Sequence, residues 1–139
     1  MNKELFTDDV MTLRVIESIT GLEEGSERVI IKFTDGTKIK QEHEQECCES
    51  VTIAQVDGNV DKHIGATMVS IEEKVTRPSE EVTDEDGYSY TPESLTATFY
   101  TLKTSKGYLD WRWDGESNGY YSESVECKFI KPGGTNDNS

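Results

Sequence analysis

The chain has 139 residues, of which 33% are hydrophobic and 30% charged, and its formal net charge at pH 7 is −14. This apolar content is too high for a wholly disordered chain, and no apolar run approaches the roughly 20 residues that a membrane-spanning helix needs. Length and composition predict one domain without membrane association. The first residues lack the apolar stretch of a secretory signal, so we expect a cytoplasmic protein.

The acidity is concentrated in two runs. Residues 41–50 and 79–94 hold 10 of the 28 acidic residues and no Lys or Arg. Phosphates would be repelled, which predicts no direct nucleic-acid binding and makes a basic surface on a protein partner a suitable target. The alternative interpretation is that the runs are solvated segments that keep the protein soluble.

The cysteines do not form a disulfide framework. Cys47 and Cys48 are adjacent, Cys127 is the third, and an odd count without regular spacing indicates a reducing compartment.

The first half of the chain predicts short strands joined by turns. Residues 1–12 are expected to form a flexible arm, and residues 13–130 a single β-rich domain. Runs of β-branched and apolar residues predict strands over 13–19, 28–33, 37–40, 50–56 and 66–75. Asp35-Gly36 is typical of a hairpin turn, and residues 59–64 suit one helical turn with Asn59 as its cap. Alternation directs one set of side chains inward (Val29, Ile31, Phe33, Ile39) and a basic stripe outward (Arg28, Lys32, Lys38, Lys40).

The second half predicts further antiparallel strands. Residues 78–94 are expected to form an acidic flexible loop, and strands are expected over 94–103, 108–114 and 120–130, with turns over 104–107 and 115–119. A polar, disordered tail is expected over 131–139. The predicted fold class is mainly β (α+β at most), with antiparallel strands in a curved sheet or a small sandwich and one short helix. Oligomeric state is left open.

Metal or catalytic chemistry has little support in the pattern. His43, Cys47 and Cys48 lie among four glutamates, but adjacent cysteines on a strand point to opposite faces and cannot easily share a zinc ion. Cys48 and His43 are the candidate nucleophile and base of a small hydrolase, although no spacing enforces that pairing. We therefore predict no metal, no cofactor and no catalytic residues.

A short aromatic segment is the most informative part of the sequence. Residues 111–122 combine tryptophans and tyrosines with an arginine and several hydrogen-bonding side chains, as binding hot spots and stacking pockets do. The competing interpretation places both tryptophans in the core. The predicted binding residues are Cys48, Glu49, Ser50, Trp111, Arg112, Trp113, Glu116, Ser117, Asn118, Tyr120, Tyr121 and Ser122.

Two motifs carry a resemblance to a known family. The segment Cys47-Cys48-Glu49-Ser50-Val51, followed by Val56-Asp57-Gly58 and Ile64-Gly65, and the later segment from Gly115 to Ser122 resemble small uncharacterised proteins of bacteriophages and prophages. The similarity covers residues 13–77 and 94–130. The resemblance implies a phage setting and host-cell cytoplasm, suggests that the two motif segments meet in the fold, and transfers no catalytic residue.

Three functional hypotheses follow. The first is a non-catalytic phage accessory protein that binds and blocks a host factor such as an antiviral immune effector. The second is a module that sequesters a nucleotide immune signal, with Trp111, Trp113, Tyr120 and Tyr121 for stacking and Arg112 or the basic stripe for phosphate. The third is the small hydrolase. A pocket lined by Arg112 and lysines favours the nucleotide, whereas acidic groups around an exposed apolar surface favour a protein partner.

Overall fold

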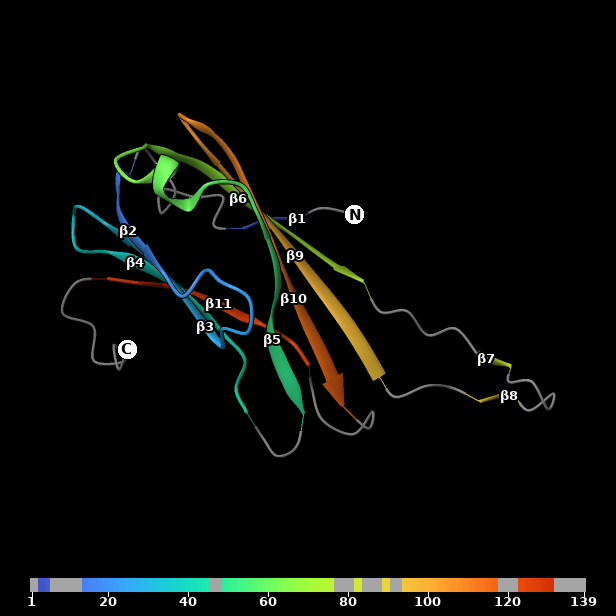
Figure 1. Ribbon diagram of the computed structural model, residues 1–139. Helices are drawn as coiled ribbons and strands as arrows, with labels where there is room; N and C mark the ends of the chain where they lie inside the picture. The colour runs from blue at the N-terminus through green and yellow to red at the C-terminus, as the bar shows by residue number, and fades with distance from the viewer. Residues whose placement is uncertain are drawn as a thin grey trace.

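The computed structural model describes residues 3–5, 14–45, 49–76, 82–83, 89–90, 94–117 and 123–131. Two antiparallel sheets make up the fold, with one 3₁₀ turn as the helical element among these residues (Figure 1). The larger sheet has the order β1-β6-β9-β10-β5, and the smaller has the order β11-β4-β3-β2. The predicted fold class, antiparallel β with one short helix, is confirmed.

The four-stranded sheet is built around a hairpin that the sequence predicts. Its strands are β2 (Ile16–Thr20), β3 (Arg28–Phe33), β4 (Lys38–Glu42) and β11 (Glu126–Ile130). Gly36 adopts φ 89° in the β3–β4 turn, a conformation that favours glycine. The inward set predicted from alternation is confirmed, because all four of its apolar side chains are buried.

The five-stranded sheet centres on a long hairpin. Its strands are β1 (Lys3–Leu5), β5 (Ser50–Asp57), β6 (Met68–Thr76), β9 (Ser94–Thr104) and β10 (Gly107–Ser117). The alternation of side chains over 108–114 predicts that Leu109, Trp111 and Trp113 share one face of the strand. They do so in β10, and all three are buried. Gly115, Glu116 and Ser117 were expected in a turn, and this expectation is wrong, because they continue β10. Gly115 and Glu116 pair with both β5 and β9, and Ser117 pairs with β9.

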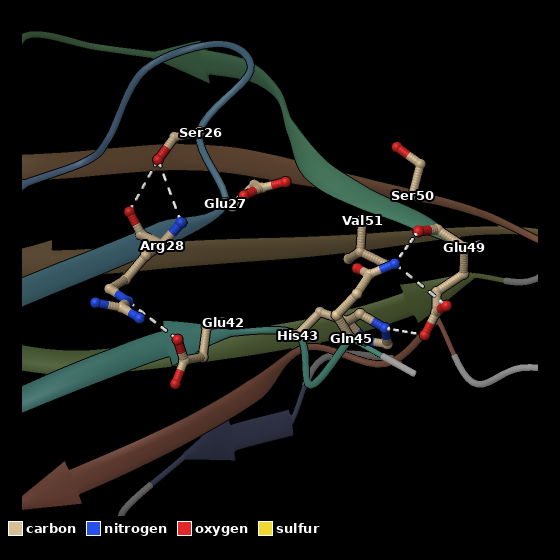
Figure 2. A pocket seen from close by; sticks show the side chains of 9 residues that line it. All are labelled: Ser26, Glu27, Arg28, Glu42, His43, Gln45, Glu49, Ser50 and Val51. Carbon is tan, nitrogen blue, oxygen red and sulfur yellow. Dashed lines mark hydrogen bonds and ion pairs between the residues drawn. The ribbon is translucent and has the colours of Figure 1, made fainter. Parts of the chain in front are cut away.

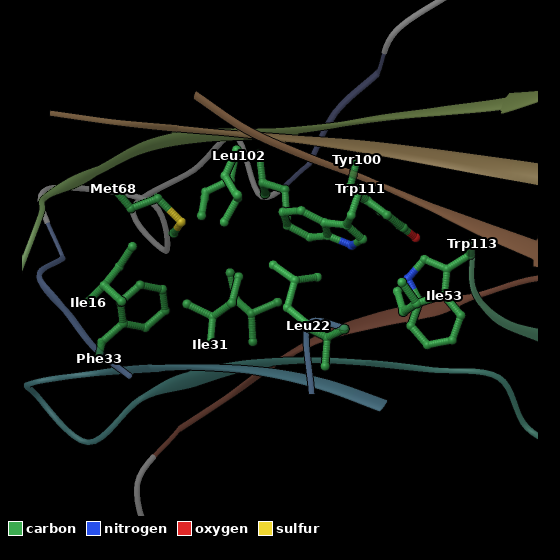
Figure 3. Packing of buried hydrophobic residues seen from close by; sticks show 14 of the residues in the cluster. Ile16, Leu22, Ile31, Phe33, Ile53, Met68, Tyr100, Leu102, Trp111 and Trp113 are labelled. Atoms are coloured by element: carbon green, nitrogen blue, oxygen red, sulfur yellow. The ribbon is translucent and has the colours of Figure 1, made fainter. Parts of the chain in front are cut away.

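The core lies between the two sheets (Figure 3). Ile31 and Phe33 of the smaller sheet face Leu102 and Trp111 of the larger one, and Met68 completes this layer. Apolar area removed from water by this packing is the main driving force for the fold.

Backbone hydrogen bonds join the sheets along both sides. The Ile16 N–H donates to the Ala66 carbonyl at 2.9 Å, and the Gly65 N–H donates to the Ile16 carbonyl at 2.8 Å. On the opposite side, the loop between β2 and β3 pairs with β5: the Gly25 N–H donates to the Ile53 carbonyl at 2.8 Å, and the Ile53 N–H donates to Ser26 at 2.9 Å. The edge of β5 is therefore occupied at Ile53.

The predicted helical turn is present as η2 (Val60–His63). The Asn59 side chain caps it by accepting a hydrogen bond from the Asp61 N–H at 3.0 Å, and Gly65 follows with φ 84°. The position of the turn and its Asn59 cap agree with the sequence prediction.

Three segments differ from the expected boundaries. The expected N-terminal arm carries β1, which pairs with β6 from Lys3↔Glu73 to Leu5↔Ile71. The expected acidic loop contains the paired strands β7 (Val82–Thr83) and β8 (Ser89–Tyr90), and its other residues, apart from Ser94 in β9, lie outside the described part. The strand expected over 120–130 is present as β11 from Glu126 to Ile130; residues 123–125 are not in a strand, and residues 120–122 lie outside the described part. The tail beyond residue 131 also lies outside the described residues.

Candidate functional site

The two motif segments meet on neighbouring strands. In the ladder between β5 and β10, Ser50 pairs with Glu116 and Thr52 with Asp114. The structure thus places the described parts of both segments at one end of the sandwich. Two surface hollows lie there, and Ser50 lines both of them.

The first is the edge hollow, a polar space of about 550 Å³ beside the start of β5 (Figure 2). It divides into two charged groups. On one side the Arg28 Nε donates to Glu42 at 3.0 Å, and on the other His43 and Gln45 point toward Glu49. The lining residues are Ser26, Glu27, Arg28, Glu42, His43, Gln45, Glu49, Ser50 and Val51.

A buried His–Glu pair closes one side of the edge hollow. His43 Nε2 lies 2.8 Å from a Glu49 carboxylate oxygen, and the two side chains are 4% and 0% exposed. His43 Nδ1 lies 2.7 Å from the Ser124 carbonyl oxygen. Because a carbonyl only accepts, Nδ1 must carry a proton, and Nε2 and Glu49 share a second one between them. Both ring nitrogens therefore have partners.

The second is the face hollow, a space of about 370 Å³ over β5, β9 and β10. Its lining contains two carboxylates, Asp114 and Glu116, and no Lys, Arg or His. A buried carboxylate, Glu123, lies behind it and accepts a hydrogen bond from the Thr96 hydroxyl at 2.7 Å. A Cβ on Gly115 would stand 2.7 Å from the Glu123 Cβ, so this close approach requires glycine. The lining residues are Ser50, Thr52, Thr96, Ala97, Asp114, Gly115 and Glu116.

Trp111 and Trp113 belong to the core. They are 2% and 0% exposed, and both indole N–H groups donate to the Oε1 of Gln41, at 2.9 and 3.2 Å. The Gln41 amide nitrogen in turn donates to the Cys127 sulfur at 3.5 Å. Of the two interpretations of the tryptophans, the structure matches the one that places them inside. Neither ring has an open face for stacking on a ligand.

Arg112 lies on the outer face of the five-stranded sheet. Its Nε is 3.0 Å from an Asp114 carboxylate oxygen, and its register partners are Phe99 on β9 and Gln55 on β5. Of the other predicted binding residues, Ser50 and Glu116 are exposed and Glu49 is buried. Ser117 is the last residue of β10. Cys48, Asn118, Tyr120, Tyr121 and Ser122 lie outside the described residues.

The basic stripe is largely neutralised by neighbouring acids. Lys32 pairs with Glu17 at 3.3 Å, and Lys40 and Arg28 both contact Glu42, at 3.2 and 3.0 Å. A ligand phosphate would have to displace these carboxylates.

The described histidines and cysteine are held in structural contacts. His63 is buried and bonded to the Thr104 hydroxyl at 2.7 Å, and this burial lowers the pKa of His63. Burial raises the pKa of the Cys127 thiol to about 12. The part of the chain that the structure describes contains no group of three or more His, Cys, Asp or Glu side chains arranged to hold a metal ion.

Sequence reasoning missed several residues around the site. Gln41 and Glu123 were not singled out, because each acts on a partner far away in the chain. The loop between β2 and β3, which lines the edge hollow through Ser26 and Glu27, was not singled out either. The one available signal was Gly115, a glycine between polar residues that interrupts a strong strand pattern.

Fold and site together define an antiparallel β-sandwich with two surface hollows at one end, in both of which carboxylates outnumber Lys and Arg side chains. A family model described as a domain of unknown function, DUF7448, matches residues 10–127, and the chain belongs to this family. No curated protein and no solved structure matches the chain. Among the described residues, no helix has the length and apolar character needed to cross a membrane.

Proposed function

We propose that this protein is a non-catalytic acidic binding protein that occupies a basic surface on a protein partner. The phage resemblance of its motifs supports a partner in the host cell, and an antiviral immune effector is the target that we propose. Binding would block the effector by covering the surface that it uses for its own substrate or nucleic acid.

The charge of the surface hollows is the observation that supports a basic protein partner. In each of four hollows on the described surface, Asp and Glu side chains outnumber Lys and Arg side chains. The ratio is three to one in the edge hollow and two to none in the face hollow. The remaining two hollows each have two carboxylates and one cation. Such hollows attract ammonium and guanidinium groups and repel phosphate.

The described residues that favoured a nucleotide ligand are engaged in contacts within the protein. Trp111 and Trp113 donate their N–H groups to Gln41 inside the core, and Arg112 is paired with Asp114. Stacking and phosphate neutralisation would both require groups already engaged within the protein. A nucleotide site would have to be built from other residues.

The hydrolase hypothesis loses its proposed base. His43 would need a free ring nitrogen to accept a proton from a nucleophile, and both nitrogens are engaged by Glu49 and Ser124. Cys48, the candidate nucleophile of that hypothesis, lies outside the described residues.

The proposal is tested in two stages. The immobilised protein is incubated with host lysate at low and at high salt, and each retained protein is then purified and titrated by calorimetry. We expect a basic partner whose affinity falls steeply with ionic strength. In parallel, plaque counts of a defence-sensitive phage on an immune host should rise when the host expresses the protein.

The contrary results are specific. A nucleotide retained in stoichiometric amount, seen by native mass spectrometry of the protein purified from the host, would replace this proposal with the sequestration hypothesis. Unchanged plaque counts across a panel of defence systems would count against immune blocking.

A further inference from the structure

The five-stranded sheet has one face against the core and one face turned outward. Strand pairing places the outward side chains in rows that cross the sheet. One row runs Lys74, Phe99, Arg112 and Gln55, and a second runs Glu72, Thr101, Asp110 and Asp57. Within the part of the chain that the structure describes, the four-stranded sheet packs on the opposite face, so this outer face is uncovered.

Phe99 stands at the centre of the outer face. Its side chain is 38% exposed although it lies on a central strand, with Lys74 opposite on β6 and Arg112 opposite on β10. It lines one hollow with Glu72, Glu73 and Lys74, of about 270 Å³, and a second with Asp57, Asp110 and Arg112, of about 210 Å³. An exposed aromatic ring between two hollows is a suitable anchor for a partner side chain.

The outer face has more carboxylates than are engaged in ion pairs within the protein. Glu72 is paired with Lys103 at 3.0 Å, and Asp114 with Arg112 at 3.0 Å. Three further carboxylates have no ion pair among the described residues: Asp57, Asp110 and Glu116. Asp57 and Asp110 accept only from the neutral groups of Gln55 and Thr101. Lys74, which lies beside Phe99 on β6, offsets one of these three charges. The face keeps a net negative charge, with Asp57 and Asp110 on one side of Phe99 and Glu116 on the other.

From this charge pattern, and resting on the proposed function, we infer that the outer face of the five-stranded sheet is the docking face for a basic segment of the protein partner. Arginine fits best. Its planar guanidinium stacks on the ring of Phe99, and its N–H groups bind the carboxylate of Asp110 in the neighbouring row of outward side chains. A second arginine of the same segment binds Glu116, which lies six residues along β10 from Asp110, about 20 Å away. The partner meets the face and not the β5 edge, because Gly25 and Ser26 already occupy that edge at Ile53.

A synthetic peptide of alternating Arg and Ser serves as the probe, with the same peptide carrying citrulline in place of Arg as the uncharged control. Backbone amide shifts in an assigned NMR spectrum locate binding. We expect shifts along β9 and β10 around Phe99, Asp110 and Glu116 with the arginine peptide, and none with citrulline.

Two charge-matched double variants test the assignment. Asp110→Asn with Glu116→Gln removes two charges from the face and keeps the acceptor for the Thr101 hydroxyl. Glu23→Gln with Glu24→Gln removes two exposed charges from the loop between β2 and β3. The face variant should bind the peptide about tenfold more weakly and the loop variant should bind like wild type, at equal melting temperatures.

Each other outcome has a definite meaning. Equal weakening by both variants, or shifts centred on Glu23 and Glu24, would overturn the docking face while leaving a basic protein partner in place. No peptide binding at all would also overturn it. If the purified protein retains a nucleotide in addition, the proposed function falls as well.

Discussion

Gln41 joins the two sheets through a buried hydrogen-bond network, and replacing it with leucine is a sharp test of the core. Its Oε1 accepts from both indole N–H groups, at 2.9 and 3.2 Å, and its own side chain is fully buried. In Gln41→Leu both donors lose their acceptor inside the core. Each orphaned donor costs about 1–3 kcal/mol, so unfolding should become roughly 2–6 kcal/mol easier. A matched control is Gln55→Leu, an exposed glutamine on β5, which should change stability by less than about 0.5 kcal/mol.

The measurement is urea unfolding followed by tryptophan fluorescence, combined with a double-mutant cycle. Trp113→Phe removes one donor, so in that background Gln41→Leu leaves only the Trp111 N–H without its partner. The cost of Gln41→Leu should therefore fall by about 1–3 kcal/mol in the Trp113→Phe protein. Additivity within about 0.5 kcal/mol would refute the shared acceptor. A loss below about 1 kcal/mol in the single variant would show that the indoles find other acceptors.

Three further outcomes are expected. Burial lowers the pKa of His63 in the folded protein, so the unfolded chain binds more protons below about pH 6.5. The free energy of unfolding should therefore fall as the pH drops from 7 toward 5. His63→Gln should flatten this slope when melting is measured at several pH values. Gly115→Ala forces a Cβ against Glu123 and should cost about 1–3 kcal/mol by chemical denaturation, whereas a cost near zero would mean that the Glu123 segment moves aside. Burial raises the pKa of Cys127 to about 12, so its thiol should resist iodoacetamide at pH 8 in the native protein and react after unfolding. Peptide mass spectrometry follows the labelling, and rapid labelling of the native protein would contradict the burial of this thiol.

Local pattern was enough to predict the strands that alternate cleanly. Between Arg28 and Phe33 the period of two and the Asp35-Gly36 turn agree, and the strand bounds match the structure. The same alternation placed Trp111 and Trp113 on one face of β10. It did not distinguish a buried face from a binding face, because that depends on which sheet packs against it.

Long-range partners account for the predictions that failed. Gly115 and Glu116 have a turn-like composition, yet pairing with β5 and β9 on both sides holds them in a strand. Lys3–Leu5 has little strand signal and forms β1 only because β6 offers an edge. Tertiary pairing overrides local propensity in both cases.

The candidate site was only partly accessible from the sequence. The two motif segments were expected to meet, and Ser50 and Glu116 do pair. The contacts of His43 with Glu49 and Ser124 follow from the packing of three separate chain segments, which spacing alone does not encode.

The pairing of β5 with β10 has a consequence for how the chain is made. Ser50 leaves the ribosome well before Glu116, and at roughly 5–20 residues per second the interval lasts several seconds. During that time Val51 and Ile53, buried in the finished protein, have no sheet to join on the β10 side. The interval is longer still for β4, because its partner strand β11 ends at residue 130. The sandwich can therefore close only after residue 130 has been translated, and overproduction should be sensitive to temperature and chaperone supply until that point.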